Sequence, residues 1–241
     1  MFKNFSAKLW DSVVLPFYFI AVIWVVQLIQ VIFNADFAGL GIRPLLQSGL
    51  KGILFSPLIH ANWGHLLANT LPFFVLSAIV IFFYRRIAVP SFIIIYALSG
   101  FITWLLPFQL AYHIGASGVI YGLWAFILCM GIFRRNLKSI ALSLIVLFYF
   151  GSMIAGIVPG QESISWQGHL AGLLAGVFTA FWYKETIEKD EEKKQYSWEQ
   201  EPQQLDQPFF LDRDVFNKNK AERQREASQN EDFPSWFSNR T

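Results

Sequence analysis

The feature that most constrains this chain is a series of long stretches without a charged residue. Only 12 of its 19 Lys and Arg and 17 Asp and Glu residues lie in residues 1–183. The uncharged stretches are 12–35, 52–84, 87–133, 139–161 and 163–183. A helix crosses the hydrocarbon core of a bilayer with about 20 apolar residues, so the longest stretch must hold two spans. We predict an all-α membrane protein, a six-helix bundle with spans at 12–34, 64–84, 88–106, 117–133, 138–157 and 166–183.

The remainder of the chain, residues 184–241, has the opposite character. It carries 14 acidic and 10 basic residues and no sustained hydrophobic periodicity. We predict two parts: a six-span domain over 1–183 and a charged, largely disordered tail over 184–241. The tail identifies no partner, and no basic stripe with interleaved aromatics indicates nucleic acid. The one cysteine, Cys129, is interpreted as a packing residue.

The direction of the spans follows from Lys and Arg in the short loops. Basic residues precede the first span, separate spans 2 and 3, separate spans 4 and 5, and follow span 6. They are Lys3, Lys8, Arg85, Arg86, Arg134, Arg135, Lys138 and Lys184. The positive-inside rule then puts both termini in the cytoplasm of a multi-pass protein of the cell membrane. Loops 35–63, 107–116 and 158–165 face outward.

Polar residues inside spans are costly in lipid, so each is a functional candidate. The candidates are His65 and Asn69 in span 2, Ser117 and Tyr121 in span 4, and His169 in span 6. These three spans run from outside to inside, and the candidates lie near their outer ends. The spans therefore bring a hydroxyl, two imidazoles and a carboxamide to one depth. Each residue alone has a structural interpretation, a helix cap for the serine or a packed histidine, and their shared depth favours a site.

Glycines at a spacing of four residues predict how the serine and histidine meet. Gly118 with Gly122, and Gly172 with Gly176, let spans 4 and 6 approach closely. Generic tight packing would use the same spacing. A base must come within about 2.6–3.2 Å of the hydroxyl that it deprotonates. Tyr121 lies one turn below the serine, where it can pack against the histidine ring. No carboxylate occurs in any span, so the predicted unit is a Ser–His dyad.

Acyl transfer also needs donors for the developing oxyanion. His65 and Asn69 are four residues apart and share one face of span 2. Backbone N–H groups around Ser117 lie at a helix N-terminus, where negative charge is favoured. The sequence therefore predicts an oxyanion hole formed by His65, Asn69 and the backbone of Ser117.

Three motifs resemble those of the rhomboid intramembrane serine proteases. They are His60-Ala-Asn-Trp-Gly-His65-Leu-Leu-Ala-Asn69, Gly115-Ala-Ser117-Gly118 with Tyr121, and Gly168-His169-Leu-Ala-Gly172-Leu-Leu-Ala-Gly176. The resemblance implies Ser117 as nucleophile, His169 as general base, the same oxyanion hole, and His60 as a brace of the outer loop. It implies transmembrane protein substrates and no cofactor. Many relatives carry a Trp-Arg pair in the first outer loop, where this chain has Lys51-Gly52.

Other classes of function fit less well. A rhomboid-like protein that binds and escorts membrane proteins without cutting them is the main alternative, and it typically lacks the serine or the histidine. A transporter predicts charged residues near the midplane or interrupted spans in paired halves. A zinc protease predicts an HExxH motif. An intramembrane aspartyl protease needs two Asp residues in spans.

Overall fold

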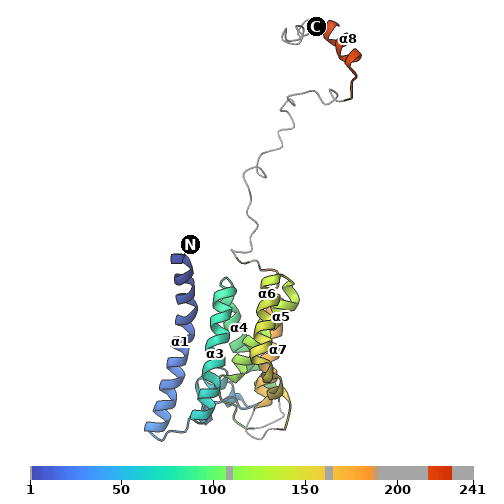
Figure 1. Cartoon of the computed structure of the whole chain (residues 1–241). Helices are drawn as coiled ribbons and strands as arrows, with labels where there is room; N and C mark the ends of the chain where they lie inside the picture. Colours follow the sequence, from blue (N-terminus) through green and yellow to red (C-terminus); the bar gives the residue numbers. More distant parts are fainter. Residues whose placement is uncertain (1, 107–110, 161–164, 187, 189–216, 230–241) are drawn as a thin grey trace. The chain divides into compact units, whose positions relative to one another are not determined.

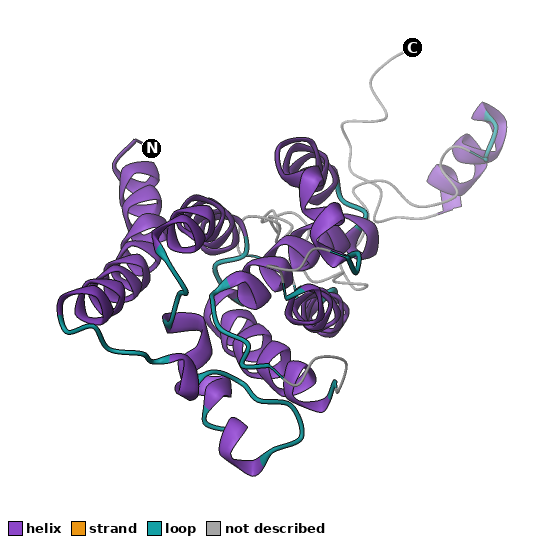
Figure 2. Cartoon of the chain, turned by 90° about the horizontal axis from the view of Figure 1, so that it is seen from below, coloured by secondary structure: helices purple, strands orange, loops and turns teal. Residues whose placement is uncertain are grey.

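A computed structural model describes residues 2–106, 111–160, 165–186, 188 and 217–229. The chain divides into two compact units, Met1–Glu192 and Lys193–Thr241. Within the described part the secondary structure is helical, apart from one isolated bridge between Ile42 and His113. Figure 1 shows the long helices of the first unit side by side, and Figure 2, turned by 90°, shows helices and loops.

Six long helices follow the predicted spans closely. They are α1 (Phe2–Ile32), α3 (Trp63–Phe83), α4 (Ala88–Leu105), α5 (Ser117–Arg134), α6 (Leu137–Phe150) and α7 (Trp166–Tyr183). The short elements are η1 (Ala38–Leu40), η2 (Gln47–Gly49), α2 (Gly52–Phe55) and η3 (Ser56–Leu58) in the outer loop, and η4 (Gly151–Ile157) after α6. Side chains cap three of the long helices: Asn62 caps α3, Asn136 caps α6 and Ser165 caps α7.

Five of these helical segments are long and apolar enough to cross a membrane. They are Ser6–Ile32, Trp63–Phe83, Ala88–Leu105, Ser117–Arg134 and Leu137–Ile157. α7 is not among them, although its 18 residues would extend about 27 Å at 1.5 Å per residue. Its composition explains the difference, because α7 combines Gln167 and His169 with three glycines. The sixth span therefore stays a prediction.

Two helix ends differ from the predicted spans for local reasons. α1 begins at Phe2, ten residues before the uncharged stretch, because a helix can continue past the bilayer into the polar region. The last seven residues of the fifth predicted span form the 3₁₀ helix η4, which begins at Gly151 and contains Gly156. The predicted outer loops 107–116 and 158–165 include residues 107–110 and 161–164, which lie outside the described residues.

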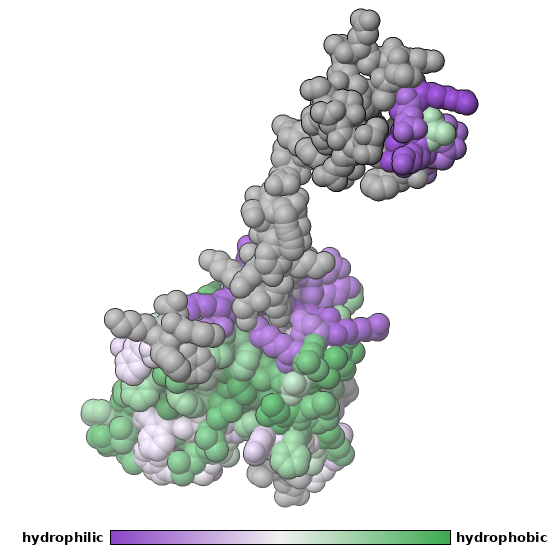
Figure 3. All heavy atoms as spheres, turned by 45° about the horizontal axis from the view of Figure 1, so that its top comes forward, coloured by the Kyte–Doolittle hydropathy of each residue, from purple (hydrophilic) through white to green (hydrophobic). Residues whose placement is uncertain are grey.

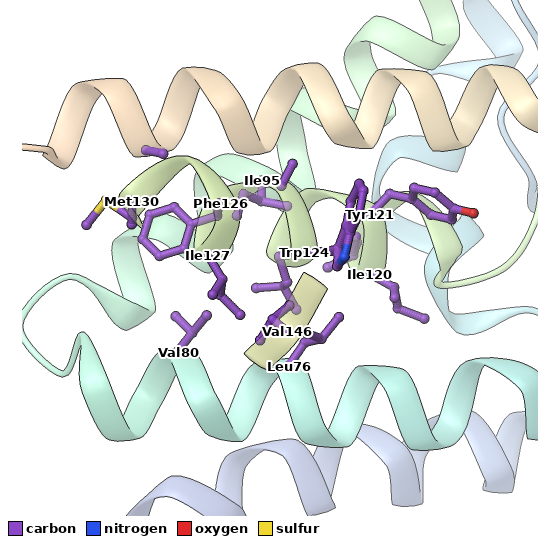
Figure 4. Close-up of a cluster of buried hydrophobic side chains, with 14 of the residues drawn as sticks. Leu76, Val80, Ile95, Ile120, Tyr121, Trp124, Phe126, Ile127, Met130 and Val146 are labelled. Atoms are coloured by element: carbon purple, nitrogen blue, oxygen red, sulfur yellow. The ribbon is translucent and has the colours of Figure 1, made fainter. Parts of the chain in front are cut away.

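α5 forms the centre of the bundle. Sixty-one per cent of its membrane-spanning window is buried, against 22% for α1 and 11% for α6 with η4. Its aromatic and aliphatic side chains form the core with residues of α3, α4 and α6, including Leu76, Val80, Ile95 and Val146. In Figure 4, Tyr121 lies at one end of this cluster and its hydroxyl points away from the other labelled side chains.

Basic residues gather at the end of the bundle opposite Ser117. Arg85, in the α3–α4 connection, forms an ion pair with Asp11 of α1. Arg134, at the end of α5, donates to the carbonyl of Thr186, which follows α7. Figure 3 shows a largely hydrophobic bundle face with hydrophilic residues at one end. This grouping is the charge asymmetry from which cytoplasmic termini were predicted. The orientation of the termini stays a prediction.

The predicted tail is described only in part. The buried carboxylate of Glu188 accepts a hydrogen bond from the backbone N–H of Arg86 at 3.1 Å, so the chain just after α7 packs against the α3–α4 connection within the first unit. In the second unit, α8 (Lys220–Gln229) is a helix preceded by Asn219, which exchanges hydrogen bonds with Glu222. Residues 189–216 and 230–241 lie outside the described residues, so disorder of the tail stays a prediction.

Candidate active site

The contact between α5 and α7 is made largely by glycine backbone. A Cβ atom added to Gly172 would lie 1.9 Å from the carbonyl oxygen of Gly118, and one added to Gly176 would lie 2.1 Å from that of Gly122. No side chain fits between the two backbones at these positions. The close approach predicted from the glycine spacing is therefore present, and it fixes the relative depth of the first turns of both helices.

Tyr121 and His169 pack together across this contact. Their ring centroids are 4.1 Å apart and the ring planes differ by 12°, which is a stacked arrangement. The Tyr121 hydroxyl donates to the carbonyl of Met153 in η4 at 2.8 Å. Tyr121 is thus held at both ends, by its own helix and by η4, and its ring presents a flat wall that restricts rotation of the His169 imidazole.

One ring nitrogen of His169 has a specific partner. Its Nδ1 lies 2.8 Å from the carbonyl oxygen of Gly156, also in η4. A carbonyl can only accept a hydrogen bond, so the neutral ring must carry its proton on Nδ1. Nε2 is then left with a lone pair and can act as a base. The imidazole is 8% exposed, so little water competes for this interaction.

Ser117 is the first residue of α5 and lines a small cavity. The cavity volume is about 30 Å³, enough for one or two water molecules. Its wall includes Ser56, Thr103, His113, Ser165 and Gly168. Within the described residues the Ser117 hydroxyl makes no hydrogen bond to the His169 ring. Contacts between catalytic groups are often longer in the absence of substrate, so this separation does not exclude the pair.

One of the predicted oxyanion donors, His65, lies against the backbone just before Ser117. Gly115 has φ of +109°, and a Cβ there would lie 2.6 Å from Cε1 of the His65 ring. His65 therefore packs directly against the backbone two residues before Ser117. Asn69 is buried, and its amide nitrogen donates to the carbonyl of His65 at 2.8 Å. That bond uses one of its two N–H groups and leaves the second for another acceptor.

His60 joins the outer loop to the same segment. Its Nε2 accepts from the backbone N–H of Ala116 at 3.4 Å, and its carbonyl accepts from Gln30 of α1 at 3.1 Å. The His60 and His65 rings meet edge to face with centroids 5.1 Å apart. Burial, together with the nearby His65 ring, lowers the pKa of His60 from 6.5 to about 3. His60 is therefore neutral near pH 7, as its acceptor role requires.

The three sequence motifs do not identify two features of the site. The carbonyl of Gly156 belongs to a residue without a side chain, and His113 with Ser165 lies in loops outside the three motifs. The structure shows that His113 is buried and that Ser165 caps α7, and neither property is visible in the sequence motifs. No group of three or more His, Cys, Asp or Glu residues in the described part is placed to hold a metal ion.

Taken with the apolar helices, this arrangement defines a multi-pass membrane protein in which a half-buried serine, Ser117, and a buried histidine, His169, lie near one end of the central helix pair. The Rhomboid domain family matches residues 47–185, which include α2 to α7. The chain belongs to the rhomboid family.

The chain is also similar to proteins from several bacteria. An uncharacterised protein of Mycobacterium tuberculosis is 42% identical over 174 residues, which cover 68% of this chain and 71% of that protein. One of Mycobacterium leprae is 38% identical over 173 residues, 68% of each chain. YdcA of Bacillus subtilis, named provisionally as a rhomboid protease, is 31% identical over 130 residues, 52% of this chain and 62% of its own.

Proposed function

We propose that this chain is an intramembrane serine endopeptidase that cuts transmembrane segments of other membrane proteins near their outer ends. Ser117 is the nucleophile and His169 the general base. The observation that carries the proposal is the 2.8 Å contact between His169 Nδ1 and the carbonyl of Gly156. It orients the base and selects its tautomer without a carboxylate, which is the role that Asp fills in a Ser-His-Asp triad.

The residues support a two-step acyl transfer. Nε2 of His169 takes the hydroxyl proton as Oγ of Ser117 attacks the scissile carbonyl, and it returns that proton to the leaving amine. The N–H of Ser117, the second N–H of Asn69 and the ring of His65 are the candidate donors to the oxyanion. Water then hydrolyses the ester on Ser117, and the polar cavity beside that residue is a place from which water can enter.

The depth of Ser117 suggests where substrates are cut. It begins α5 at the end of the bundle away from the basic residues, which is the outer end if both termini are cytoplasmic. A helical substrate shields its carbonyls, so the segment must unwind before attack, and unwinding in lipid is costly. We therefore expect substrates to contain Gly, Pro or other weak helix formers near the cut.

A fluorophosphonate probe on detergent-solubilised protein tests the proposal. Wild-type protein should be labelled and should cleave a reconstituted transmembrane substrate. Ser117→Ala should abolish labelling, and His169→Ala should lower the rate by roughly 10³-fold or more, since an unassisted hydroxyl is a poor nucleophile. Ser117→Ala should retain the wild-type unfolding midpoint, and His169→Ala should remain folded with a lower midpoint, because it removes a buried ring that stacks on Tyr121. Equal labelling of Ser117→Ala would refute the nucleophile, and folded wild-type protein that neither labels nor cleaves would favour a binding and escort role.

A further inference from the structure

His113 is a buried histidine that the proposed chemistry does not use. It lies four residues before Ser117 and is 6% exposed. Its Nδ1 lies 2.6 Å from the hydroxyl oxygen of Ser165, which is the residue immediately before α7. The two side chains thus connect the segment that carries the proposed nucleophile to the helix that carries the proposed base.

The backbone of His113 is fixed independently of this contact. Its N–H donates to the carbonyl of Ile42 at 2.8 Å, and its carbonyl accepts from the N–H of Ile42 at 2.9 Å. Two residues later, the N–H of Gly115 donates to the carbonyl of Ser56 at 2.8 Å. The segment before Ser117 is therefore bound to the first outer loop at two points, and the His113 side chain extends from a defined position.

Ser165 is equally well connected to α7. Its hydroxyl oxygen accepts from the N–H of Gly168 at 3.3 Å, and its carbonyl accepts from the N–H of His169 at 3.2 Å. A hydroxyl has one proton and two lone pairs, so Ser165 can cap the helix and bond to His113 at the same time. A shift of Ser165 moves the first turn of α7, and the His169 ring moves with it.

The location of the pair relates it to the reaction. His113, Ser165 and Gly168 line the same cavity as Ser117. The His169 ring itself is held by stacking on Tyr121 of α5 and by the carbonyl of Gly156 in η4. The first turn of α7 therefore has one lateral support in η4 and another in His113.

We propose that His113 is a positioning residue that, by hydrogen bonding to Ser165, sets the distance between Ser117 and His169. The inference rests on the proposed protease function. Its consequence is specific to turnover, because the pair controls the alignment of two groups that must come within hydrogen-bond reach. A misplacement of about 1 Å can cost about 10²-fold in rate. Binding of the substrate segment does not depend on that distance, so the Michaelis constant should change little.

The test compares His113→Leu, His113→Asn, Ser165→Ala and Ser165→Thr in full-length protein reconstituted with a transmembrane substrate. His113→Leu should lower kcat by roughly 10–10²-fold. His113→Asn should recover most of the loss, because a side-chain amide atom can occupy the place of Nδ1. Ser165→Thr should remain near wild type. The double variant His113→Leu with Ser165→Ala should be no slower than the slower single variant, because both remove one interaction. Tyr112→Leu, an exposed neighbour that contacts Arg43, is the control and should leave kcat unchanged.

Each result decides between positioning and mere bracing of the fold. Wild-type kcat in His113→Leu, or no recovery in a stably folded His113→Asn, would overturn the inference, as would losses that multiply in the double variant. If His113→Leu does not fold, Ser165→Ala still removes the interaction from the other side, and a wild-type kcat in that variant would overturn the inference. Ser117→Ala tests the protease proposal separately. If Ser117→Ala is inactive while the His113 variants behave as wild type, the protease proposal stands and only the His113 inference fails. Inactive wild-type protein would overturn both.

Discussion

The inner and outer helices of this bundle are held by different means. α5 and α7 meet through glycine backbone, with Gly172 against the carbonyl of Gly118. α1 and α6 leave most of their surface open, and Phe148 of α6 is 81% exposed. Lipid tails are as apolar as leucine, so burial of apolar side chains does not drive helices together within a bilayer. Close packing of backbones can drive helices together, and it occurs in this chain between the two helices whose proposed catalytic residues must align.

The largest effect should come from a single methyl group at the inner contact. Gly172→Ala places a Cβ 1.9 Å from a backbone oxygen, which only a separation of α5 and α7 can relieve. We expect the free energy of unfolding to fall by about 3 kcal/mol or more, and activity to be lost. The measurement is the unfolding midpoint in detergent together with probe labelling.

Gly151→Ala is the matched control in the outer region. The nearest atom to its added Cβ is 3.9 Å away, and its φ of −62° suits alanine. This change should be neutral or should stabilise by about 0.4–1 kcal/mol, because it restricts the unfolded chain. Similar unfolding midpoints for Gly172→Ala and Gly151→Ala would contradict the distinction between the central and the peripheral helices of the bundle.

The second prediction concerns η4, a peripheral segment that contacts both Tyr121 and His169. Gly156→Ala, in the same 3₁₀ segment as Gly151, would put its Cβ 2.0 Å from the Tyr121 hydroxyl and 3.1 Å from His169 Nδ1. We expect the labelling rate to fall roughly 10²-fold, with a smaller loss of stability than in Gly172→Ala. A labelling rate equal to that of Gly151→Ala would show that η4 does not orient the base.

The third and smallest effect is on the pH dependence of stability. The pKa of His60 is lowered to about 3 by burial, so the fold favours its neutral form. The contribution of neutral His60 to the free energy of unfolding is complete above pH 6.5 and is lost progressively as the pH falls toward 3. His60→Gln can still accept from Ala116 and cannot titrate, so its midpoint should fall less between pH 7 and pH 4.5. The other histidines are common to both proteins and cancel in the difference. Parallel pH curves for the two proteins would contradict the prediction.

The helices could be predicted from the sequence because charged residues interrupt the apolar stretches between them. Except for α1, each span begins within a residue or two of the predicted position. The family could be predicted from the three motifs, and the Rhomboid domain match confirms it. The contact of Tyr121 with His169 followed from their positions near the ends of two glycine-bearing helices. The catalytic roles of Ser117 and His169 remain predictions.

The remaining features depend on contacts that no local pattern encodes. The pairing of His113 with Ile42 and Ser165 joins three loops that are distant in sequence, and its geometry is set only when the helices assemble. The 3₁₀ winding of η4 turns the carbonyl of Gly156 toward His169, whereas the uncharged pattern over 138–157 predicted a regular helix. Periodicity reports which face of a segment is apolar and does not report where a backbone carbonyl points.

The contact of the proposed base with a main-chain oxygen also affects how the protein can change by mutation. A triad aspartate can be lost through one codon change, and an alanine scan finds it at once. The carbonyl of Gly156 is present whatever amino acid the codon specifies, so no substitution deletes it. Its importance would register in a mutational survey only as intolerance of any larger residue at position 156, a pattern easily read as a packing constraint. In this chain, the group that would orient the proposed base is inherited through the path of the backbone.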